Sequence, residues 1–403
     1  MKGGRGVARV ELRKRLERTI GGGHPWVYRD ALAGTPRLPD GAVVQLASRN
    51  GRPLAIGFWD ARSPIAVRVL GDATAIGDVP TLVGQRIAAA LARRLALIDR
   101  RETDAFRWIH GEADGLPGVH VDVYGEAASI RCDGGGAAAF YRGLPAQLRE
   151  AARAAGIALR TIVERRSARR GAGGGEDRTA VVLGAPPDDE IEVRENGLRF
   201  GVDLLHGQKG GLFLDQRDNR ALVRTLASGR RVLNLFGYTG GFSVYAAAGG
   251  ARTTVTVDAA TPAIAAARRN FERNGLPAGD ARFVAGDAFA FLERAARERE
   301  RFDVVISDPP SFAPSRRALA TGLRAYRRLH RLCAAVTAPG GTLCAASCSS
   351  HVDRATFLAT VRDGAGDAGR RFRLHEVRGS GADHPVVAQF PEGDYLKFAV
   401  GAL

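Results

Sequence analysis

The sequence is poor in several residue types, and each shortage narrows what the chain can be. It has four cysteines in 403 residues, with no Cys-x-x-Cys pair and no histidine at metal-ligand spacing beside them. A disulfide framework and a zinc site are therefore not expected. No apolar run approaches the roughly 18 residues of a membrane helix, and the first residues lack the apolar core of a signal peptide. The sequence predicts a cytoplasmic globular protein with reduced cysteines.

Lysine is also scarce, yet the chain carries a large positive charge. Its 59 lysine and arginine residues outnumber 43 acidic residues, which gives a formal net charge of +16 at pH 7. A GC-rich genome would explain arginine in place of lysine, but it would not explain the surplus. Such a surplus favours a polyanionic partner, because each phosphate contact releases counterions. We therefore expect a nucleic acid as the partner.

Length and local pattern predict three domains, since 403 residues exceed one ordinary core. Residues 1–75 hold short strand-like runs between turn residues, which is typical of a small β-rich module. Residues 76–200 combine a helix over 80–100, several strands and a helix near 137–155, which indicates a central α+β domain. Residues 201–403 form the third domain.

The third region alternates strands and helices, which predicts an α/β domain whose parallel sheet has helices on both faces. Strands are expected at 231–236, 253–258, 281–285, 302–307 and 342–348. Helices are expected at 241–249, 261–274, 287–299, 316–336 and 353–362. Two later strands are expected near 371–377 and 394–400. Five parallel strands and a late pair fit the seven-stranded, Rossmann-like sheet of class I methyltransferases better than a six-stranded dinucleotide-binding sheet.

Three successive strand ends carry the residue types that a nucleoside cofactor needs. The first strand leads into Phe236-Gly237-Tyr238-Thr239-Gly240, where glycines let the backbone approach a ligand. The second ends at Asp258, whose carboxylate can accept both hydroxyls of a ribose. The third ends near Asp287, which can meet an adenine amino group. Because the loop is not GxGxxG, a nicotinamide cofactor is weakly indicated, and the set favours S-adenosylmethionine.

The fourth strand ends in Asp308-Pro309-Pro310. Two prolines after the acid prevent a helix from starting at once and hold the loop rigid. Such loops recur where a flat base is held beside a methyl donor. The plain alternative is a turn that only terminates the strand.

Cys348 stands apart from the other cysteines, because it lies at a strand end between Ser347 and Ser349. Cys344 in mid-strand and Cys333 on a helix are expected to be inert small hydrophobes, and Cys132 lies away from this sheet. Ligands bind outside the carboxyl ends of strands in such sheets, so Cys348 and Asp308 should meet at one edge.

This pairing suits covalent attack on a pyrimidine. The Cys348 thiolate would add to carbon 6 of cytosine and make carbon 5 nucleophilic. Asp308 would bind the ring near nitrogen 3 and stabilise the developing charge. The target base must be unpaired or flipped to reach such a site.

Together the motifs resemble the bacterial large-subunit rRNA cytosine-5 methyltransferases that carry an N-terminal PUA domain. The resemblance runs nearly the whole length and rests on these segments: His24-Pro25-Trp26, Asp114-Gly115-Leu116-Pro117-Gly118, His206-Gly207-Gln208-Lys209-Gly210, Leu214-Asp215-Gln216-Arg217-Asp218, Phe236 to Phe242, Asp308-Pro309-Pro310, Ser347-Cys348-Ser349, Asp383-His384-Pro385 and Pro391 to Lys397.

The resemblance implies a PUA domain for RNA contact, a connecting α+β domain and a Rossmann-like catalytic domain. It implies that Cys348 is the nucleophile and that Gln216, Asp258, Asp287 and Asp308 line the donor or base site. The family includes homodimers, so a dimer is a further expectation. The chain departs from many members at Ser311, where they have lysine, which bears on the choice of RNA target.

We therefore predict methyl transfer to carbon 5 of a cytosine in 23S rRNA. Related enzymes with an Asp-Pro-Pro loop methylate nitrogen 7 of guanine, but they lack a cysteine where this chain has Cys348. Methylation of an exocyclic amino group usually requires an aromatic residue after the prolines, where Ser311 stands. A non-catalytic RNA-binding factor for ribosome assembly is the alternative from another class, and loss of all donor binding would favour it.

Overall fold

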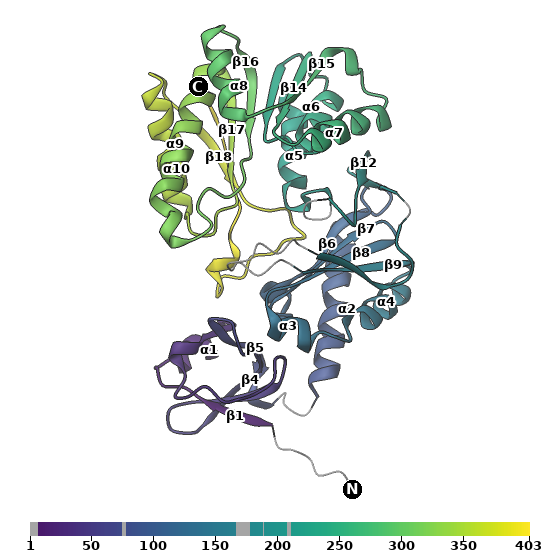
Figure 1. The fold of residues 1–403 in the computed structure, drawn as a ribbon, viewed down its shortest axis with the longest axis vertical. Helices are drawn as coiled ribbons and strands as arrows, with labels where there is room; N and C mark the ends of the chain where they lie inside the picture. Colours follow the sequence, from purple (N-terminus) through teal and green to yellow (C-terminus); the bar gives the residue numbers. More distant parts are fainter. Residues whose placement is uncertain (1–6, 75–77, 167–177, 188, 208–210) are drawn as a thin grey trace. The chain divides into compact units, whose positions relative to one another are not determined.

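The computed structural model describes residues 7–74, 78–166, 178–187, 189–207 and 211–403 (Figure 1). Its contacts divide the chain into two compact units. The first unit contains Met1–Ile191, Asp203–Gly210 and Asp383–Gly393; the second contains Glu192–Val202, Gly211–Ala382 and Asp394–Leu403. Neither unit is one continuous segment of chain.

The first unit begins with a five-stranded sheet in the order β1-β3-β4-β5-β2. Its strands are β1 (Ala8–Glu11), β2 (Trp26–Tyr28), β3 (Val43–Ala47), β4 (Pro53–Trp59) and β5 (Ile65–Asp72), with the short helix α1 (Glu17–Gly21) between β1 and β2. Strands β1 and β3 pair in parallel and the other pairs are antiparallel. The predicted β-rich module is confirmed.

A second five-stranded sheet follows in the order β10-β9-β8-β7-β6. Its strands are β6 (Ala105–His110), β7 (Val119–Tyr124), β8 (Ala127–Cys132), β9 (Thr161–Arg166) and β10 (Arg178–Leu183). Helix α2 (Val79–Leu97) is the helix predicted over 80–100. The single helix predicted near 137–155 is wrong. Two helices stand there, α3 (Gly135–Phe140) and α4 (Leu144–Ala154), and α4 has a proline in its first turn, where proline starts helices well.

The two sheets of the first unit share a hydrophobic core. Ile56, Phe58 and Leu70 of the first sheet belong to the same buried cluster as Ile87 of α2 and Trp108 of β6. The domain boundary predicted between residues 75 and 76 lies outside the described residues, as does the 208–210 part of the His206 motif. The three-domain division stays a prediction.

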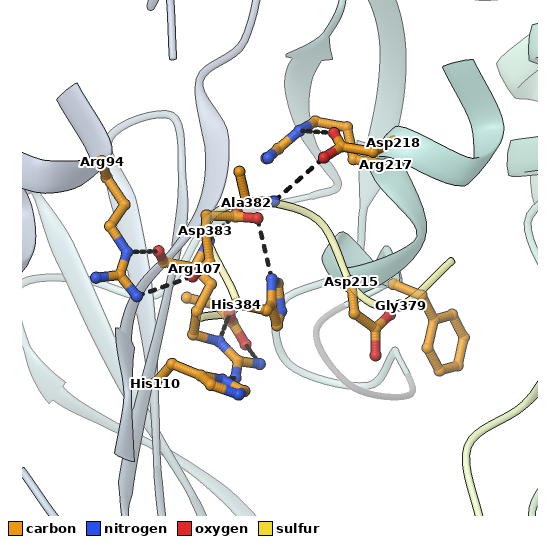
Figure 2. A network of polar contacts seen from close by, with 12 residues as sticks. Arg94, Arg107, His110, Asp215, Arg217, Asp218, Gly379, Ala382, Asp383 and His384 are labelled. Carbon is orange, nitrogen blue, oxygen red and sulfur yellow. Dashed lines mark hydrogen bonds and ion pairs between the residues drawn. The ribbon is translucent and has the colours of Figure 1, made fainter. Parts of the chain in front are cut away.

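A late segment of the chain completes the first unit. Asp383 is fully buried, its carbonyl accepts a hydrogen bond from Arg94 at 2.8 Å, and its carboxylate accepts the backbone N–H of Arg107 at 2.9 Å (Figure 2). Further along, the ring of Phe390 lies 4.6 Å from that of Trp26. Residues close to the C-terminus therefore supply buried contacts to helix α2 and strands β2 and β6.

The second unit is built on the predicted seven-stranded sheet, in the order β15-β14-β13-β16-β17-β19-β18. The strands are β13 (Arg231–Leu235), β14 (Thr253–Asp258), β15 (Ala281–Ala285), β16 (Phe302–Ser307), β17 (Thr337–Ser347), β18 (Arg373–Arg378) and β19 (Lys397–Ala402). The first five are parallel neighbours, and β19 runs antiparallel to both β17 and β18. A hairpin, β11 (Ile191–Glu195) and β12 (Leu198–Val202), precedes the sheet.

Helices cover both faces of this sheet, because its buried strands are apolar on both sides. Helices α8 (Ala288–Arg297), α9 (Leu319–Val336) and α10 (Arg354–Asp367) share one core with Leu233 and Val305. Helices α5 (Arg217–Leu226) and α6 (Gly241–Ala248) share the other with Val232 and Ile306. Helix α7 (Thr261–Arg273) contacts β14 and β15. Figure 1 shows α9 beside α10 in this unit.

The predicted strands and helices of this sheet are confirmed within a few residues, with one correction. Strand β17 begins at Thr337 and not at residue 342, because Thr337 pairs with Phe302 across an irregularity in the ladder. It ends at Ser347, so Cys348 is the first residue beyond the strand. Among the described residues, no helix combines the length and apolar character that crossing a bilayer demands.

Candidate active site

The loop after β13 has an unusual backbone. Phe236 and Tyr238 adopt φ values of 57° and 46°, a region that residues with a side chain seldom occupy, and Gly240 adopts 79°. Such conformations cost of order 1–3 kcal/mol each and cluster where a chain binds ligands. The loop therefore has the character of a binding loop rather than of a simple connection.

Close packing explains the two glycines of this loop. A Cβ on Gly237 would lie 2.6 Å from Cγ2 of Thr256, and one on Gly240 would lie 2.8 Å from Cβ of Ala267. Real Cβ atoms do not approach so closely, so only glycine fits at either position. The loop is thus held against β14 and α7 while its backbone stays at the carboxyl edge of the sheet.

Asp258 is fixed by the same loop. Its carboxylate accepts the backbone N–H of Tyr238 and that of Ala260, both at 2.9 Å. Each carboxylate oxygen has a second lone pair, so the group can still accept two hydroxyls of a ribose. The predicted ribose acid therefore stands directly beside the predicted glycine loop.

The other predicted donor-site residues differ in what they contact. Asp287 is exposed at the start of α8, where its side chain accepts the N–H of Ala290 at 2.8 Å. Thr239 is buried, and its hydroxyl donates to the carbonyl of Gly211 at 3.3 Å. Asp287 thus has a carboxylate oxygen at the carboxyl edge of the sheet, whereas the side chain of Thr239 helps to hold the loop after β13 in place.

Gln216 lies against Asp308. Its side-chain amide donates to Oδ2 of Asp308 at 3.0 Å, and its carbonyl oxygen accepts from Asn219 at 2.6 Å. Gln216 is buried, whereas Asp308 is partly exposed just beyond β16. Two residues that the sequence assigned to one site, from segments far apart in the chain, are therefore in contact.

Cys348 is half-buried at the end of β17, in a network of hydroxyl groups. The Tyr326 hydroxyl accepts a hydrogen bond from Ser347 and shares one with Ser349, each at 2.9 Å. Ser349 also lies 2.9 Å from the hydroxyl of Ser311, which follows the Asp-Pro-Pro loop. The cysteine segment and the proline loop are therefore joined by side chains, as the shared strand edge predicts.

The other three cysteines have environments that suppress their reactivity. Burial raises the pKa of Cys132, Cys333 and Cys344 to about 12. A thiol with such a pKa forms almost no thiolate at neutral pH, and the thiolate is the nucleophile. The sequence-based choice of Cys348 over these three is consistent with this chemistry.

Lys397 is a candidate site residue to which the sequence analysis gave no role, although it ends one of the segments that carry the family resemblance. It is 1% exposed, and its ammonium donates to the carbonyls of Ser349 at 2.7 Å and Tyr395 at 2.8 Å. The signal was present, because the chain has only four lysines and this one stands in an apolar strand. Tyr326 was missed as well, since a tyrosine on a helix gives no such signal.

These features fit S-adenosylmethionine. A loop with two positions that only glycine fits, a fixed carboxylate on the next strand and an acid after the strand beyond it match a nucleoside with a ribose and an adenine. Within the described ranges, no group of three or more His, Cys, Asp or Glu side chains is arranged to hold a metal ion.

Comparison with known proteins identifies the family. Residues 144–369 match the family described as S-adenosylmethionine-dependent methyltransferase, and residues 10–72 match the PUA-like domain. The fold also matches a putative SAM-dependent methyltransferase from Streptococcus mutans with a TM-score of 0.83, over 98% of this chain and 100% of that one. A second structure with the same score, over 98% and 99% of the two chains, is a putative methyltransferase complexed with SAH. At 23% identity, both show a shared fold.

Curated relatives cover almost the entire chain. Ribosomal RNA large subunit methyltransferase I of Aeromonas salmonicida is 37% identical, over 96% of this chain and 97% of its own. A ribosomal RNA large subunit methyltransferase of Deinococcus radiodurans is 38% identical, over 96% of each chain. The chain therefore belongs to the family of S-adenosylmethionine-dependent methyltransferases that includes ribosomal RNA large subunit methyltransferase I.

Proposed function

We propose that the protein methylates carbon 5 of a cytosine in 23S rRNA, with Cys348 as a covalent nucleophile. The observation that carries this proposal is the half-buried Cys348 just beyond β17, linked by hydroxyl groups to the loop that follows Asp308. The names of the relatives, the PUA-like match and the net charge of +16 support ribosomal RNA as the substrate.

The reaction begins at the cysteine. The Cys348 thiolate forms a bond from sulfur to carbon 6, and the electron pair of the 5,6 double bond becomes available at carbon 5. Asp308 shares a proton with nitrogen 3 and so limits the negative charge on the ring, while Gln216 holds the other side of its carboxylate. S-adenosylmethionine, when bound, supplies the methyl group that carbon 5 takes.

The second half restores the ring. A base removes the proton from carbon 5, the double bond forms again, and the bond between sulfur and carbon 6 breaks. The thiolate of Cys348 is regenerated, so the net change is a methyl group in place of one proton. Because the cysteine must reach carbon 6 from the face of the ring, the cytosine has to be unstacked or flipped out.

The cysteine favours carbon over nitrogen as the methyl acceptor. A ring nitrogen of guanine is already nucleophilic and needs no covalent activation. The other thiols of the chain, with a pKa raised to about 12, offer no substitute for Cys348. The guanine alternative would leave the placement of this thiol without a role.

A trapping experiment tests the proposal. RNA with 5-fluorocytosine at the target position has no proton to lose from carbon 5, so wild-type protein should remain covalently joined to it after methyl transfer. Cys348→Ala should give no adduct, whereas the matched control Cys344→Ala should give one. The absence of an adduct with active protein, or an adduct that survives Cys348→Ala, would sink the assignment.

Donor binding separates the proposal from a non-catalytic RNA-binding role. Titration calorimetry with S-adenosylmethionine should give a saturable heat with the wild-type chain. A complete absence of affinity would favour the assembly-factor alternative.

A further inference from the structure

A buried lysine lies beside the proposed nucleophile. Lys397 opens β19, and in the antiparallel ladder its Cα partner on β17 is Ser347. Its ammonium donates to the carbonyl of Ser349 at 2.7 Å and to that of Tyr395 at 2.8 Å. Strand pairing therefore fixes the backbone of Lys397 opposite the residue before Cys348, and a hydrogen bond ties its ammonium to the residue after it.

The choice of lysine at this point is unusual for this chain. Only four of its 59 basic residues are lysines, and Lys14 is half-exposed, in an ion pair with Asp30. Lys397 is 1% exposed. A compact ammonium suits two backbone carbonyls, whereas the planar fork of arginine suits a carboxylate or phosphate.

Nearby carboxylates are engaged elsewhere. Asp394 forms an ion pair with Arg354 at 3.4 Å, and Asp353 caps helix α10 by accepting the N–H of Thr356 at 2.7 Å. Tyr326, which also faces Cys348, is held neutral because burial raises its pKa. The thiolate of Cys348 is therefore the anion that the ammonium of Lys397 is best placed to stabilise.

The electrostatics of Lys397 agree with this geometry. Burial lowers the pKa of Lys397 to about 8, and Cys348 is the strongest of the neighbours that raise it, ahead of Asp394 and Asp353; Arg354 lowers it. At neutral pH Lys397 is therefore still protonated, as an ammonium, in most molecules. The interaction is mutual, so a cation that the cysteine stabilises also favours the thiolate of that cysteine.

We propose that Lys397 is a positioning residue that holds a positive charge beside Cys348 and keeps the thiol ionised at neutral pH. The inference rests on the proposed role of Cys348 as nucleophile. A stabilised thiolate favours two steps of the proposed reaction. It increases the fraction of enzyme ready to attack carbon 6, and it makes sulfur a better leaving group when the bond to carbon 6 breaks.

The pH dependence of thiol alkylation tests this without RNA or donor. The full chain is treated with iodoacetamide between pH 5 and 10, and the modification of each cysteine is followed by peptide mass spectrometry. Cys348 should reach half its maximal rate below the ordinary thiol pKa of about 8.5. Cys132, whose pKa is about 12, serves as an internal reference that reacts far more slowly at pH 7.

Substitutions of Lys397 test whether its positive charge causes the lowered pKa expected for Cys348. Lys397→Gln keeps a hydrogen-bond donor and loses the charge, and Lys397→Met loses both. Each should lower the alkylation rate of Cys348 at pH 7 about tenfold, the change that accompanies a rise of one in the pKa. Lys14→Met, which removes an exposed ammonium, should leave the rate unchanged. Circular dichroism checks that each variant is folded.

Two results would overturn the inference. One is a wild-type Cys348 that titrates at about 8.5 or higher, which needs no variant to be decisive. The other is a folded Lys397→Gln protein with an unchanged profile. A lowered thiol pKa without a 5-fluorocytosine adduct would refute cytosine chemistry and keep the Lys397–Cys348 pair; an adduct with an ordinary thiol pKa would refute only the pair.

Discussion

The same strands form the interior of the seven-stranded sheet and its carboxyl edge, yet a residue of one type has opposite environments in the two places. Cys344 lies inside β17, fully buried among apolar side chains of the α5–α6 face, and burial raises its pKa to about 12. Cys348 lies just past the end of that strand, among hydroxyl groups and a buried ammonium. The same thiol is a packing group in one place and a candidate nucleophile in the other.

The difference follows from where backbone hydrogen bonding ends. Inside the sheet the ladder pairs the main chain, so side chains need only pack between helices. At the edge the chain leaves the ladder, and polar side chains must satisfy one another and the backbone. Asp258 binds the N–H of Tyr238, Gln216 binds Asp308, and Lys397 binds two carbonyls. The candidate functional side chains lie at the carboxyl edge because polar groups can find hydrogen-bond partners there.

The largest expected effect separates Cys344, inside β17, from Cys348, just beyond its end. Cys348→Ala should lower kcat/KM for methyl transfer to 23S rRNA by at least about 1,000-fold, since the step that activates carbon 5 is lost. Cys344→Ala should stay within a few fold of wild type and lose only some thermal stability. Initial rates with radiolabelled donor measure both. Comparable losses in the two variants would erase the distinction between edge and interior.

The two ends of β16 offer the next comparison. Asp308→Asn should reduce kcat/KM about 100-fold, because asparagine stabilises the negative charge that develops on the cytosine ring less well than the carboxyl group of Asp308 does. Asp303 lies near the opposite end, where it accepts the N–H of Arg231 at 2.8 Å. Asp303→Asn keeps an acceptor and should have little effect on rate. If both substitutions were equally harmful, Asp308 would be a structural acid and not part of the reaction.

Two glycines with positive φ sharpen the assignment of the donor loop. Gly240→Ala should weaken S-adenosylmethionine binding about tenfold or more, because its Cβ would meet Ala267 at 2.8 Å and displace the loop. Gly275 has a φ of 60°, and a Cβ added there would meet no atom within 4 Å. Gly275→Ala should cost about 1 kcal/mol of stability without changing donor affinity. Calorimetry and thermal melts together measure both quantities.

The smallest effect concerns two helix caps. Asp287 and Asp78 each accept an N–H in the first turn of a helix, at 2.8 Å and 3.3 Å respectively. Replacing either by alanine should cost about 1 kcal/mol of stability. Only Asp287→Ala, at the carboxyl edge, should also weaken donor binding, by a few fold. Unchanged affinity in that variant would remove Asp287 from the adenine site.

Most of the sheet could be predicted from the sequence because parallel strands buried on both faces are short apolar runs between turns. The same reasoning failed where a segment looked like a turn. Thr337 to Gly341 contains Pro339 and two glycines, yet it continues β17 through its pairing with Phe302. That pairing is a long-range contact, which local pattern does not encode.

The candidate site also contains residues that the sequence predicts and residues that only the structure shows. Acids and glycines at strand ends are visible in sequence, since their position along the chain is itself the signal. The role of Lys397 could not be predicted because lysine is ordinarily exposed, and its burial depends on β19 pairing with β17. The hydroxyl network around Tyr326 depends on three segments that meet only in the folded chain. Spatial partners of the nucleophile therefore require the structure.

The return of residues 383–393 to the first unit has a consequence for synthesis on the ribosome. Domains usually fold in the order in which they emerge, the N-terminal one first. Here Asp383 supplies the acceptor for the partly buried Arg107 N–H, and Phe390 packs on Trp26, so these early residues depend on residues that are synthesised much later. The first unit therefore cannot complete its native contacts until residues 383–393 have been synthesised, and by then residues 211–382 of the second unit have been synthesised as well.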